Sequence, residues 1–303
     1  MTRLRRILGP AAGAWALWRL GGPRLPPRFD GPQERPPHPP GSSVLVGRRE
    51  FFVRETGPEG GPPLVLLHGW VYDSRAAWAR LAPLLGDRYR VVAVDLRNHG
   101  RSDRIQETFD IEDLADDVAG VLDALGLGRV SVLGYSMGGM AAQALARRHP
   151  TRVERLVLAA TAAKPIPVAP WLAAPVFAVG RVLARIDPIT VPRVMHRYLL
   201  GVGAFPPEQA AWLWDTLLDR DSDLYYESAF AINRFDGRGW VGELDLPVLC
   251  LIPTRDQLIA PRLQRDTARL IPGATTVEIP GARHEAVLTH ADEMAAAIRA
   301  FLG

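Results

Sequence analysis

Short, mainly apolar runs alternate with segments of helical periodicity along most of the chain. The runs occupy residues 64–67, 91–94, 130–133, 153–159, 248–252 and 275–279, and residues 44–46 and 50–56 predict a further strand pair. Continuous apolar strands are typical of a parallel sheet that is buried on both faces. Apolar periodicity between them predicts helices at residues 76–85, 111–125, 137–148, 262–271 and 291–302. This alternation predicts an α/β fold built on a doubly wound, mostly parallel sheet.

One long segment breaks the alternation. Residues 164–240 show no strand pattern and predict helices near residues 169–186, 191–200, 208–220 and 224–235. An insertion of this length predicts a helical cap, placed before the last two strands of the sheet. Its apolar side chains either wall a substrate pocket or form the core of the cap itself. They belong to Pro165, Ile166, Val168, Trp171, Leu172, Val176, Phe177, Val182 and Leu183.

The N-terminal segment differs from the rest of the chain. Arg3, Arg5 and Arg6 precede an apolar stretch whose larger side chains share one helical face, a pattern typical of a helix that lies in a membrane interface. Two other interpretations stay open, namely a helix that packs on the protein's own body and an export signal. Residues 21–41 are rich in proline and glycine, which predicts a semi-rigid linker or a strap laid over the surface.

The predicted organisation has three parts. Residues 1–41 form the N-terminal amphipathic segment and Pro-rich linker, residues 42–163 and 241–303 form the α/β core, and residues 164–240 form the cap. A chain of 303 residues is long enough to bury a large core that carries such an insertion.

Composition and charge narrow the class of protein. Hydrophobic residues make up 48% and charged residues 23% of the chain, as in ordinary globular proteins. The net charge is only +3 and no basic cluster lies in the body of the chain, so we expect no nucleic-acid partner. No apolar run reaches the length of a membrane-spanning helix. We expect a cytoplasmic protein, with peripheral membrane contact through residues 1–20 and the oligomeric state left open.

The strongest chemical motif surrounds Ser136. The sequence from Gly134 to Gly139 fits the pattern G-x-S-x-G, follows an apolar strand and precedes a predicted helix. A serine on such a sharp turn presents its hydroxyl above the sheet, and glycines beside it let neighbouring backbone approach closely. The start of the helix adds a free N–H, that of Met137, where negative charge would develop. We interpret Ser136 as a nucleophile.

A reactive serine needs a base, and the base needs an orienting acid. His284 follows the last predicted strand and precedes the final helix, and Asp256 follows the strand at residues 248–252. The chain order Ser136, Asp256, His284 is the order expected of a serine hydrolase on a doubly wound sheet, and each residue follows the carboxyl end of a strand. Asp245 is the alternative acid, but it precedes its strand.

A second oxyanion donor is expected after the strand at residues 64–67. His68-Gly69-Trp70 follows that strand, so the backbone N–H of Trp70 would face that of Met137. The Trp70 side chain would add an apolar wall, and we expect Trp70 and Tyr135 to contact the substrate. His68 is expected to shape the loop rather than move protons.

Together these motifs resemble the α/β-hydrolase superfamily. The resemblance rests on His68-Gly69-Trp70, on residues 95–102, on residues 134–139, on Asp256 and on residues 281–284, and covers residues 42–163 and 241–303. Most relatives carry glycine where Asn98 stands, and the sequence Arg-Asn-His-Gly is similar to a subset of small carboxylesterases and thioesterases. Pro253 and Arg283 also depart from the common pattern, which affects the expected loop details.

The resemblance implies acyl transfer from a small-molecule ester to water, without a metal or organic cofactor. The apolar cap favours a carboxylic ester with an apolar acyl group or lipid-like character, as in carboxylesterases and lipases. Two alternatives stay open. One is other chemistry on the same scaffold: C–C bond hydrolysis, haloperoxidase-like perhydrolysis or cofactor-free oxygenation. The other is a catalytically silent binding module.

Overall fold

The computed structural model describes residues 29 and 31–303. Within them, eight strands form one sheet in the order β1-β2-β4-β3-β5-β6-β7-β8. β1 (Gly41–Val46), β2 (Arg49–Thr56) and β4 (Arg90–Val94) pair in antiparallel fashion, and the other neighbours are parallel. The remaining strands are β3 (Pro63–Leu67), β5 (Val130–Tyr135), β6 (Val153–Ala159), β7 (Val248–Pro253) and β8 (Thr275–Ile279). The predicted mostly parallel sheet is confirmed.

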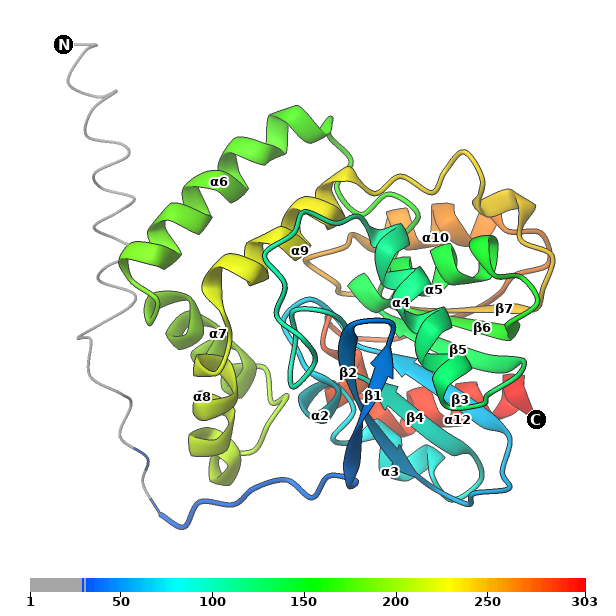
Figure 1. The fold of residues 1–303 in the computed structure, drawn as a ribbon, viewed down its shortest axis with the longest axis horizontal. Helices are drawn as coiled ribbons and strands as arrows, with labels where there is room; N and C mark the ends of the chain where they lie inside the picture. Colours follow the sequence, from blue (N-terminus) through cyan, green and yellow to red (C-terminus); the bar gives the residue numbers. More distant parts are fainter. Residues whose placement is uncertain (1–28, 30) are drawn as a thin grey trace.

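Helices cover both faces of the sheet (Figure 1). One face carries α4 (Ile111–Ala124), α5 (Met137–Arg148) and α10 (Pro261–Leu270), and the other carries α2 (Ser74–Ala77), α3 (Leu81–Leu85), α11 (Ala286–Thr289) and α12 (Ala291–Leu302). Strand residues alternate between the two cores, because successive side chains point to opposite faces. Val65 of β3 packs in the α4–α5 core, whereas Leu66 packs in the α3–α12 core.

The single helix predicted at residues 76–85 is wrong, because the chain forms the two short helices α2 and α3 there. Asp73 caps the first helix by accepting a hydrogen bond from the Ala76 N–H at 2.7 Å. Pro83 explains the break: inside one continuous helix it would remove a hydrogen bond and clash with the preceding turn. In the structure Pro83 lies in the first turn of α3, where no N–H donor is needed.

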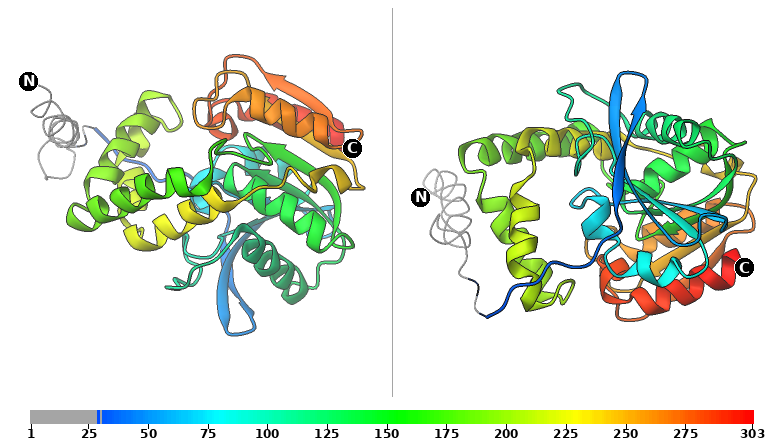
Figure 2. Two further views of the ribbon diagram at one scale, coloured as in Figure 1. Left: turned by 90° about the horizontal axis from the view of Figure 1, so that it is seen from above. Right: turned by 60° about the horizontal axis from the view of Figure 1, so that its bottom comes forward.

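A helical segment separates β6 from β7 and lies to one side of the sheet (Figure 2). It contains α6 (Pro170–Ile186), α7 (Thr190–Gly201), the 3-10 turn η1 (Pro207–Gln209), α8 (Ala210–Leu218) and α9 (Ser222–Arg234), and the turn η2 (Val241–Glu243) follows it. α6 packs along α9, and α7 packs against α8. Arg181 of α6 forms an ion pair with Glu227 of α9, and Arg185 forms one with Asp223.

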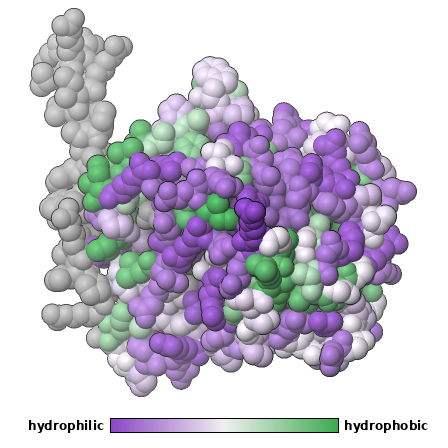
Figure 3. Space-filling view, in the orientation of Figure 1, coloured by the Kyte–Doolittle hydropathy of each residue, from purple (hydrophilic) through white to green (hydrophobic). Residues whose placement is uncertain are grey.

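The nine apolar residues that the sequence placed in the cap lie in α6 or just before it, and only some of them fit either interpretation. Pro165, Ile166 and Phe177 line a cavity, as one interpretation expected. The other six are neither pocket wall nor core, because they are 44% to 73% exposed: Val168, Trp171, Leu172, Val176, Val182 and Leu183. The cause is that α6 lies at the outer edge of the molecule, where Figure 3 shows hydrophobic side chains at the surface.

The Pro-rich segment before β1 runs along the helical segment and then the core. The Glu34 N–H donates to the Glu208 carbonyl at 2.7 Å, and the Gln33 side chain accepts from the Ala211 N–H at 3.0 Å. Further along, the Pro39 carbonyl accepts from the Arg54 guanidinium at 3.2 Å. The predicted amphipathic helix near the N-terminus lies outside the described residues. Among the helices that the structure describes, none has the length and apolar character needed to cross a membrane.

Candidate active site

Ser136 lies at the turn from β5 into α5, with φ of 54° and ψ of −116°. A positive φ is rare for a residue that carries a side chain, and it aims the hydroxyl away from the helix that follows. The glycines around it are a steric requirement. A Cβ at Gly134 would lie 2.4 Å from the Gly138 carbonyl oxygen, and one at Gly138 would lie 2.0 Å from the Leu67 carbonyl oxygen. The turn therefore packs directly on β3.

The structure brings the three residues of the predicted triad together. The Oγ of Ser136 lies 3.0 Å from Nε2 of His284, and Nδ1 of His284 lies 2.8 Å from Oδ2 of Asp256. They follow β5, β8 and β7, three strands whose carboxyl ends meet at one edge of the parallel sheet. All three are buried, and the Asp256 side chain is fully shielded from solvent. In this arrangement Nδ1–H donates to the carboxylate, which leaves Nε2 free to accept the serine proton.

Asp256 has a complete set of hydrogen-bond partners. Its Oδ1 accepts from the backbone N–H groups of Leu258 and Ile259, at 2.8 and 2.9 Å. Its Oδ2, which faces His284, also accepts from Nε2 of Gln264 at 2.9 Å. Gln264 was not predicted as a site residue from the sequence. Its only signal was a polar residue on the buried face of α10, and nothing local linked it to Asp256.

The two predicted oxyanion donors have free backbone N–H groups. Within the described residues, neither the N–H of Trp70 nor that of Met137 donates a hydrogen bond. Met137 is the first residue of α5, so its N–H has no partner inside the helix. Gly69 lets this loop approach the nucleophile, because a Cβ there would lie 3.2 Å from Cβ of Ser136. Both donors are thus available to a ligand at the serine.

Two buried histidines hold the loop of Trp70. His68 Nε2 accepts from the Leu96 N–H at 3.0 Å, which fits the structural role expected of it. His99 Nε2 lies 2.9 Å from the Trp70 carbonyl oxygen and its Nδ1 lies 2.8 Å from that of Arg97. Burial lowers the pKa of His99 to about 4, so a neutral ring donates to one of these carbonyls. The turn at residues 95–102 thereby supports the loop that carries Trp70.

Asn98, which departs from the usual glycine, lies in that same turn. Its φ is 64°, a left-handed conformation that asparagine tolerates better than most residues. The side chain stabilises the turn by accepting from the Ile105 N–H at 2.7 Å and donating to the Ile105 carbonyl at 3.2 Å. The departure from glycine is therefore compatible with the same backbone.

A mostly apolar cavity of about 270 Å³ opens beside Ser136 and His284. Both residues predicted to contact the substrate, Trp70 and Tyr135, line it. Trp70 also bridges to the helical segment: its ring stacks on Tyr225 at 4.2 Å, and its Nε1 donates to the Tyr225 carbonyl at 2.7 Å. The cavity wall comes from both the core and the helical segment: Gly69, Val71, Tyr72, Met140, Pro165, Ile166, Phe177, Met195, Ile232, Leu258, Ile259 and Glu285.

Glu285 is a second carboxylate at this cavity that the sequence analysis did not single out. It is buried beside His284 and accepts a hydrogen bond from the Tyr198 hydroxyl of α7 at 3.0 Å. Burial raises the pKa of Tyr198 to about 12, so this hydroxyl stays protonated and remains a donor at neutral pH. The pair joins the core to the helical segment, as the Trp70–Tyr225 contact also does.

Comparisons with known proteins agree with the fold. A family model described as the alpha/beta hydrolase fold matches residues 62–188. The chain is similar to the pimeloyl-acyl-carrier protein methyl ester esterase of Neisseria meningitidis, with 32% identity over 82% of this chain and 96% of that protein. It is also similar to a non-heme chloroperoxidase of Streptomyces lividans, with 28% identity over 83% and 95% of the two chains. Among solved structures, the enol-lactonase from Burkholderia xenovorans superposes with a TM-score of 0.76 and 28% identity, covering 86% of this chain and 99% of that one.

Proposed function

Because the chain belongs to the α/β-hydrolase superfamily and is a hydrolase, we propose that it is a serine esterase with Ser136 as nucleophile, His284 as general base and Asp256 as the orienting acid. One observation carries the proposal. Two hydrogen bonds, of 3.0 and 2.8 Å, connect the serine hydroxyl through the imidazole to the buried carboxylate, at the wall of an apolar cavity. Three residues far apart in the chain form one hydrogen-bonded triad, which is the arrangement that activates a serine.

The first half of the reaction forms an acyl-enzyme. Ser136 Oγ attacks the ester carbonyl while His284 Nε2 takes its proton, and Asp256 stabilises the resulting imidazolium. Negative charge develops on the carbonyl oxygen, where the N–H groups of Trp70 and Met137 would stabilise it. Loss of one such donor costs roughly 3 kcal/mol of transition-state stabilisation in other serine hydrolases. His284 then protonates the departing alcohol oxygen.

The second half returns the enzyme to its starting state. Water enters where the alcohol left, and His284 removes its proton as it attacks the acyl carbon. Collapse of the tetrahedral intermediate releases the acid and restores the Ser136 hydroxyl. The Asp256 carboxylate holds the same imidazole tautomer throughout, because its oxygens are fixed by two backbone N–H groups and Gln264.

The proposed substrate is a small-molecule ester with an apolar acyl group. The cavity supports this, since its wall is mainly aliphatic and aromatic, and its volume of about 270 Å³ suits an acyl chain of medium length. The similar proteins named as a methyl ester esterase and an enol-lactonase both act on carboxylic esters by name. We propose that residues 164–240 act as a cap, because Pro165, Ile166 and Phe177 close the cavity from that segment.

Active-site labelling tests the nucleophile. A fluorophosphonate probe should attach to the wild-type chain and not to Ser136→Ala. Ser228→Ala is the matched control, because Ser228 is also a buried serine but lies on α9 without a basic partner, so labelling should persist. A series of 4-nitrophenyl esters of rising chain length then measures the cavity. No labelling together with no ester turnover would reject the esterase and favour a silent binding module.

Perhydrolysis is the second candidate, because the chain resembles a protein named as a chloroperoxidase. In that reaction hydrogen peroxide replaces water in attacking the acyl-enzyme, and the product is a peracid. Bromination of monochlorodimedone in acetate buffer with peroxide and bromide would report it. A bromination rate far above the rate of ester hydrolysis, and lost in Ser136→Ala, would favour perhydrolysis over hydrolysis.

A peripheral membrane contact through residues 1–20 is supported by α6. The helix exposes an apolar face along its length, including Trp171, Val176 and Ile186 at 69% to 73% exposure. The Pro-rich segment reaches the neighbouring helices, since the Phe29 ring lies 5.8 Å from His196 of α7. Liposome co-sedimentation of the full chain and of a chain lacking residues 1–20 tests the proposal. Equal partitioning of the two would reject it.

A further inference from the structure

Arg220 is a half-buried cation without a bonded partner. Its guanidinium forms no hydrogen bond, ion pair or ring contact within the described residues. Every other arginine in residues 31–303 that is buried or half-buried has such a partner, as Arg75 has with Thr216 and Arg152 with Asp123. Its nitrogens keep contact with solvent, so the guanidinium is available to water or to a ligand.

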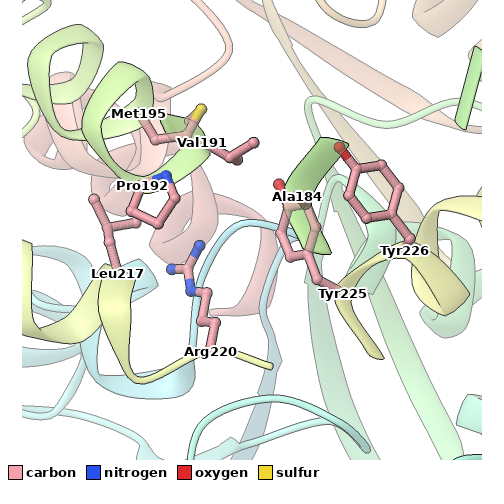
Figure 4. A pocket seen from close by; sticks show the side chains of 8 residues that line it. All are labelled: Ala184, Val191, Pro192, Met195, Leu217, Arg220, Tyr225 and Tyr226. Atoms are coloured by element: carbon pink, nitrogen blue, oxygen red, sulfur yellow. The ribbon is translucent and has the colours of Figure 1, made fainter. Parts of the chain in front are cut away.

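The side chain projects into a small pocket inside the helical segment. Figure 4 shows the guanidinium pointing between the helices, with apolar and aromatic side chains around it. The free space there is about 30 Å³, enough for a water molecule or one small polar group. The pocket wall comes from α6, α7, α8 and α9: Ala184, Val191, Pro192, Met195, Leu217, Tyr225 and Tyr226.

This pocket adjoins the reactive cavity. Met195 lines both spaces, and its flexible side chain forms the partition between them. Tyr225 lines the Arg220 pocket on one side, and its ring stacks on Trp70, which lines the reactive cavity. The positive charge of Arg220 also reaches Tyr72, another wall residue of the reactive cavity, and counteracts the rise in the pKa of Tyr72 that burial causes.

Neighbouring acids do not neutralise Arg220 by direct contact. Asp73 and Asp219 interact with it electrostatically, but neither carboxylate lies within ion-pair distance. Asp73 instead caps α2, and Asp219 is paired with Arg104. Burial lowers the pKa of Arg220, yet a guanidinium stays charged at neutral pH. An anion entering the pocket would find an available planar donor set, which suits a carboxylate.

We propose that Arg220 forms an anion-binding subsite behind Met195, and that the enzyme prefers esters whose acyl chain ends in a carboxylate. The proposal rests on the proposed esterase function and names its substrate class: hemi-esters of dicarboxylic acids. The ester group lies at Ser136, the apolar chain lies along the cavity, and the terminal carboxylate displaces Met195 and pairs with Arg220. The apolar side chains around Arg220 would strengthen this pairing, because the bound substrate would exclude water from the guanidinium.

Matched pairs of esters test the subsite. The substrates are mono-4-nitrophenyl esters of dicarboxylic acids from succinic to suberic, each compared with the 4-nitrophenyl ester of the monocarboxylic acid of equal length. Arg220→Gln should lower kcat/KM for the best anionic ester about 10- to 100-fold, mainly through KM, and change the neutral ester by about twofold or less. Arg220→Lys should keep part of the preference.

Arg104→Gln is the control for a change in net charge. Arg104 lines a second hollow together with Asp219 and Arg220 but is absent from the pocket behind Met195, so its loss should affect anionic and neutral esters alike. Thermal unfolding adds a second measure. Arg220→Gln should unfold at the same temperature as wild type or above it, since an uncompensated charge is removed. A clear loss of stability, or an equal fall for both ester classes, would overturn the proposal in favour of a structural role.

Direct binding separates this proposal from the esterase itself. Calorimetric titration of Ser136→Ala with adipate, hexanoate and chloride needs no turnover. Adipate should bind and lose affinity with Arg220→Gln added, while hexanoate should be unaffected by that change. If wild type hydrolyses no ester but adipate still binds through Arg220, the esterase fails and the subsite stands. If adipate binds no better than hexanoate, or chloride competes equally, the carboxylate subsite fails.

Discussion

The edge of the sheet and the helical segment differ in how their polar side chains are paired. At the sheet edge Asp256 has four hydrogen-bond partners, and Ser136 and His284 are fixed by the strands that precede them. In the helical segment Arg220 has no bonded partner among the described residues, and α6 exposes a row of apolar side chains. Apart from the free N–H groups of Trp70 and Met137, the triad at the sheet edge is hydrogen-bonded within the described residues, whereas the Arg220 guanidinium is not. We infer that the sheet edge carries out the reaction and that the helical segment determines which substrate is preferred.

The largest expected effect is at the sheet edge. Ser136→Ala should reduce kcat for a 4-nitrophenyl ester by roughly 10⁴- to 10⁶-fold, as loss of the nucleophile does in other serine hydrolases. Asp256→Asn should cost about 10⁴-fold, because the amide favours the wrong imidazole tautomer. Both rates come from steady-state kinetics, with thermal unfolding to show that the variants remain folded. If either variant kept a tenth of the wild-type activity, the reaction could not be assigned to the residues at this edge.

The next effect is on how the free energy of unfolding depends on pH. Burial and the nearby Asp73 charge raise the pKa of Asp95 from 3.8 to about 6, so the folded chain binds this proton more tightly than the unfolded chain. The stabilising contribution of this proton to the free energy of unfolding is complete below pH 3.8. The contribution is lost as the pH rises through 6, which lowers the free energy of unfolding by up to about 3 kcal/mol. Urea unfolding between pH 4 and 7 should show the free energy of wild type falling relative to Asp95→Asn. Parallel curves for the two would contradict this.

The third prediction concerns Gln264, which contacts Asp256 from within the core. Gln264→Leu removes one hydrogen bond to the Asp256 oxygen that faces His284, and we expect kcat to fall about tenfold with KM unchanged. Thr267→Val is the control, because Thr267 is also buried on α10 but bonds to Ala163 rather than to the triad. If both variants lower kcat equally, Gln264 only stabilises the helix.

The smallest effect belongs to the helical segment. Phe177 lines the reactive cavity, so Phe177→Ala should enlarge it and shift the preferred acyl chain to longer esters by roughly 3- to 10-fold in kcat/KM. Trp171→Ala is the matched control on the same helix, since Trp171 is 73% exposed. Its ester preference should equal that of wild type. A shift in Trp171→Ala as large as in Phe177→Ala would show that α6 does not select substrate through the cavity.

The sequence was most informative where strands end. Buried parallel strands are short apolar runs, and the residues that follow them must meet at one edge, so the positions of Ser136, Asp256 and His284 could be inferred from chain order. The same reasoning predicts Trp70 and Met137 as the oxyanion donors. The helix break at Pro83 was missed because the apolar pattern continues across it, although proline chemistry would have revealed it.

Features that depend on contacts between distant segments could not be inferred. Gln264, Glu285 and Arg220 are ordinary residues in ordinary patterns, and their significance comes from what the fold places beside them. The apolar positions of α6 show the same limit. Periodicity marks a face that avoids water, but it does not say whether that face meets a cavity, a core or nothing in the chain itself.

The backbone at Ser136 has a further consequence. Its left-handed φ of 54° is a conformation that glycine adopts freely and serine adopts only under constraint. The inactive variant Ser136→Gly should therefore be more resistant to heat than the functional chain. Selection for a stable fold and selection for a reactive hydroxyl act in opposite directions at this one position, and a stabilised variant recovered from a random library should be checked there first for lost activity.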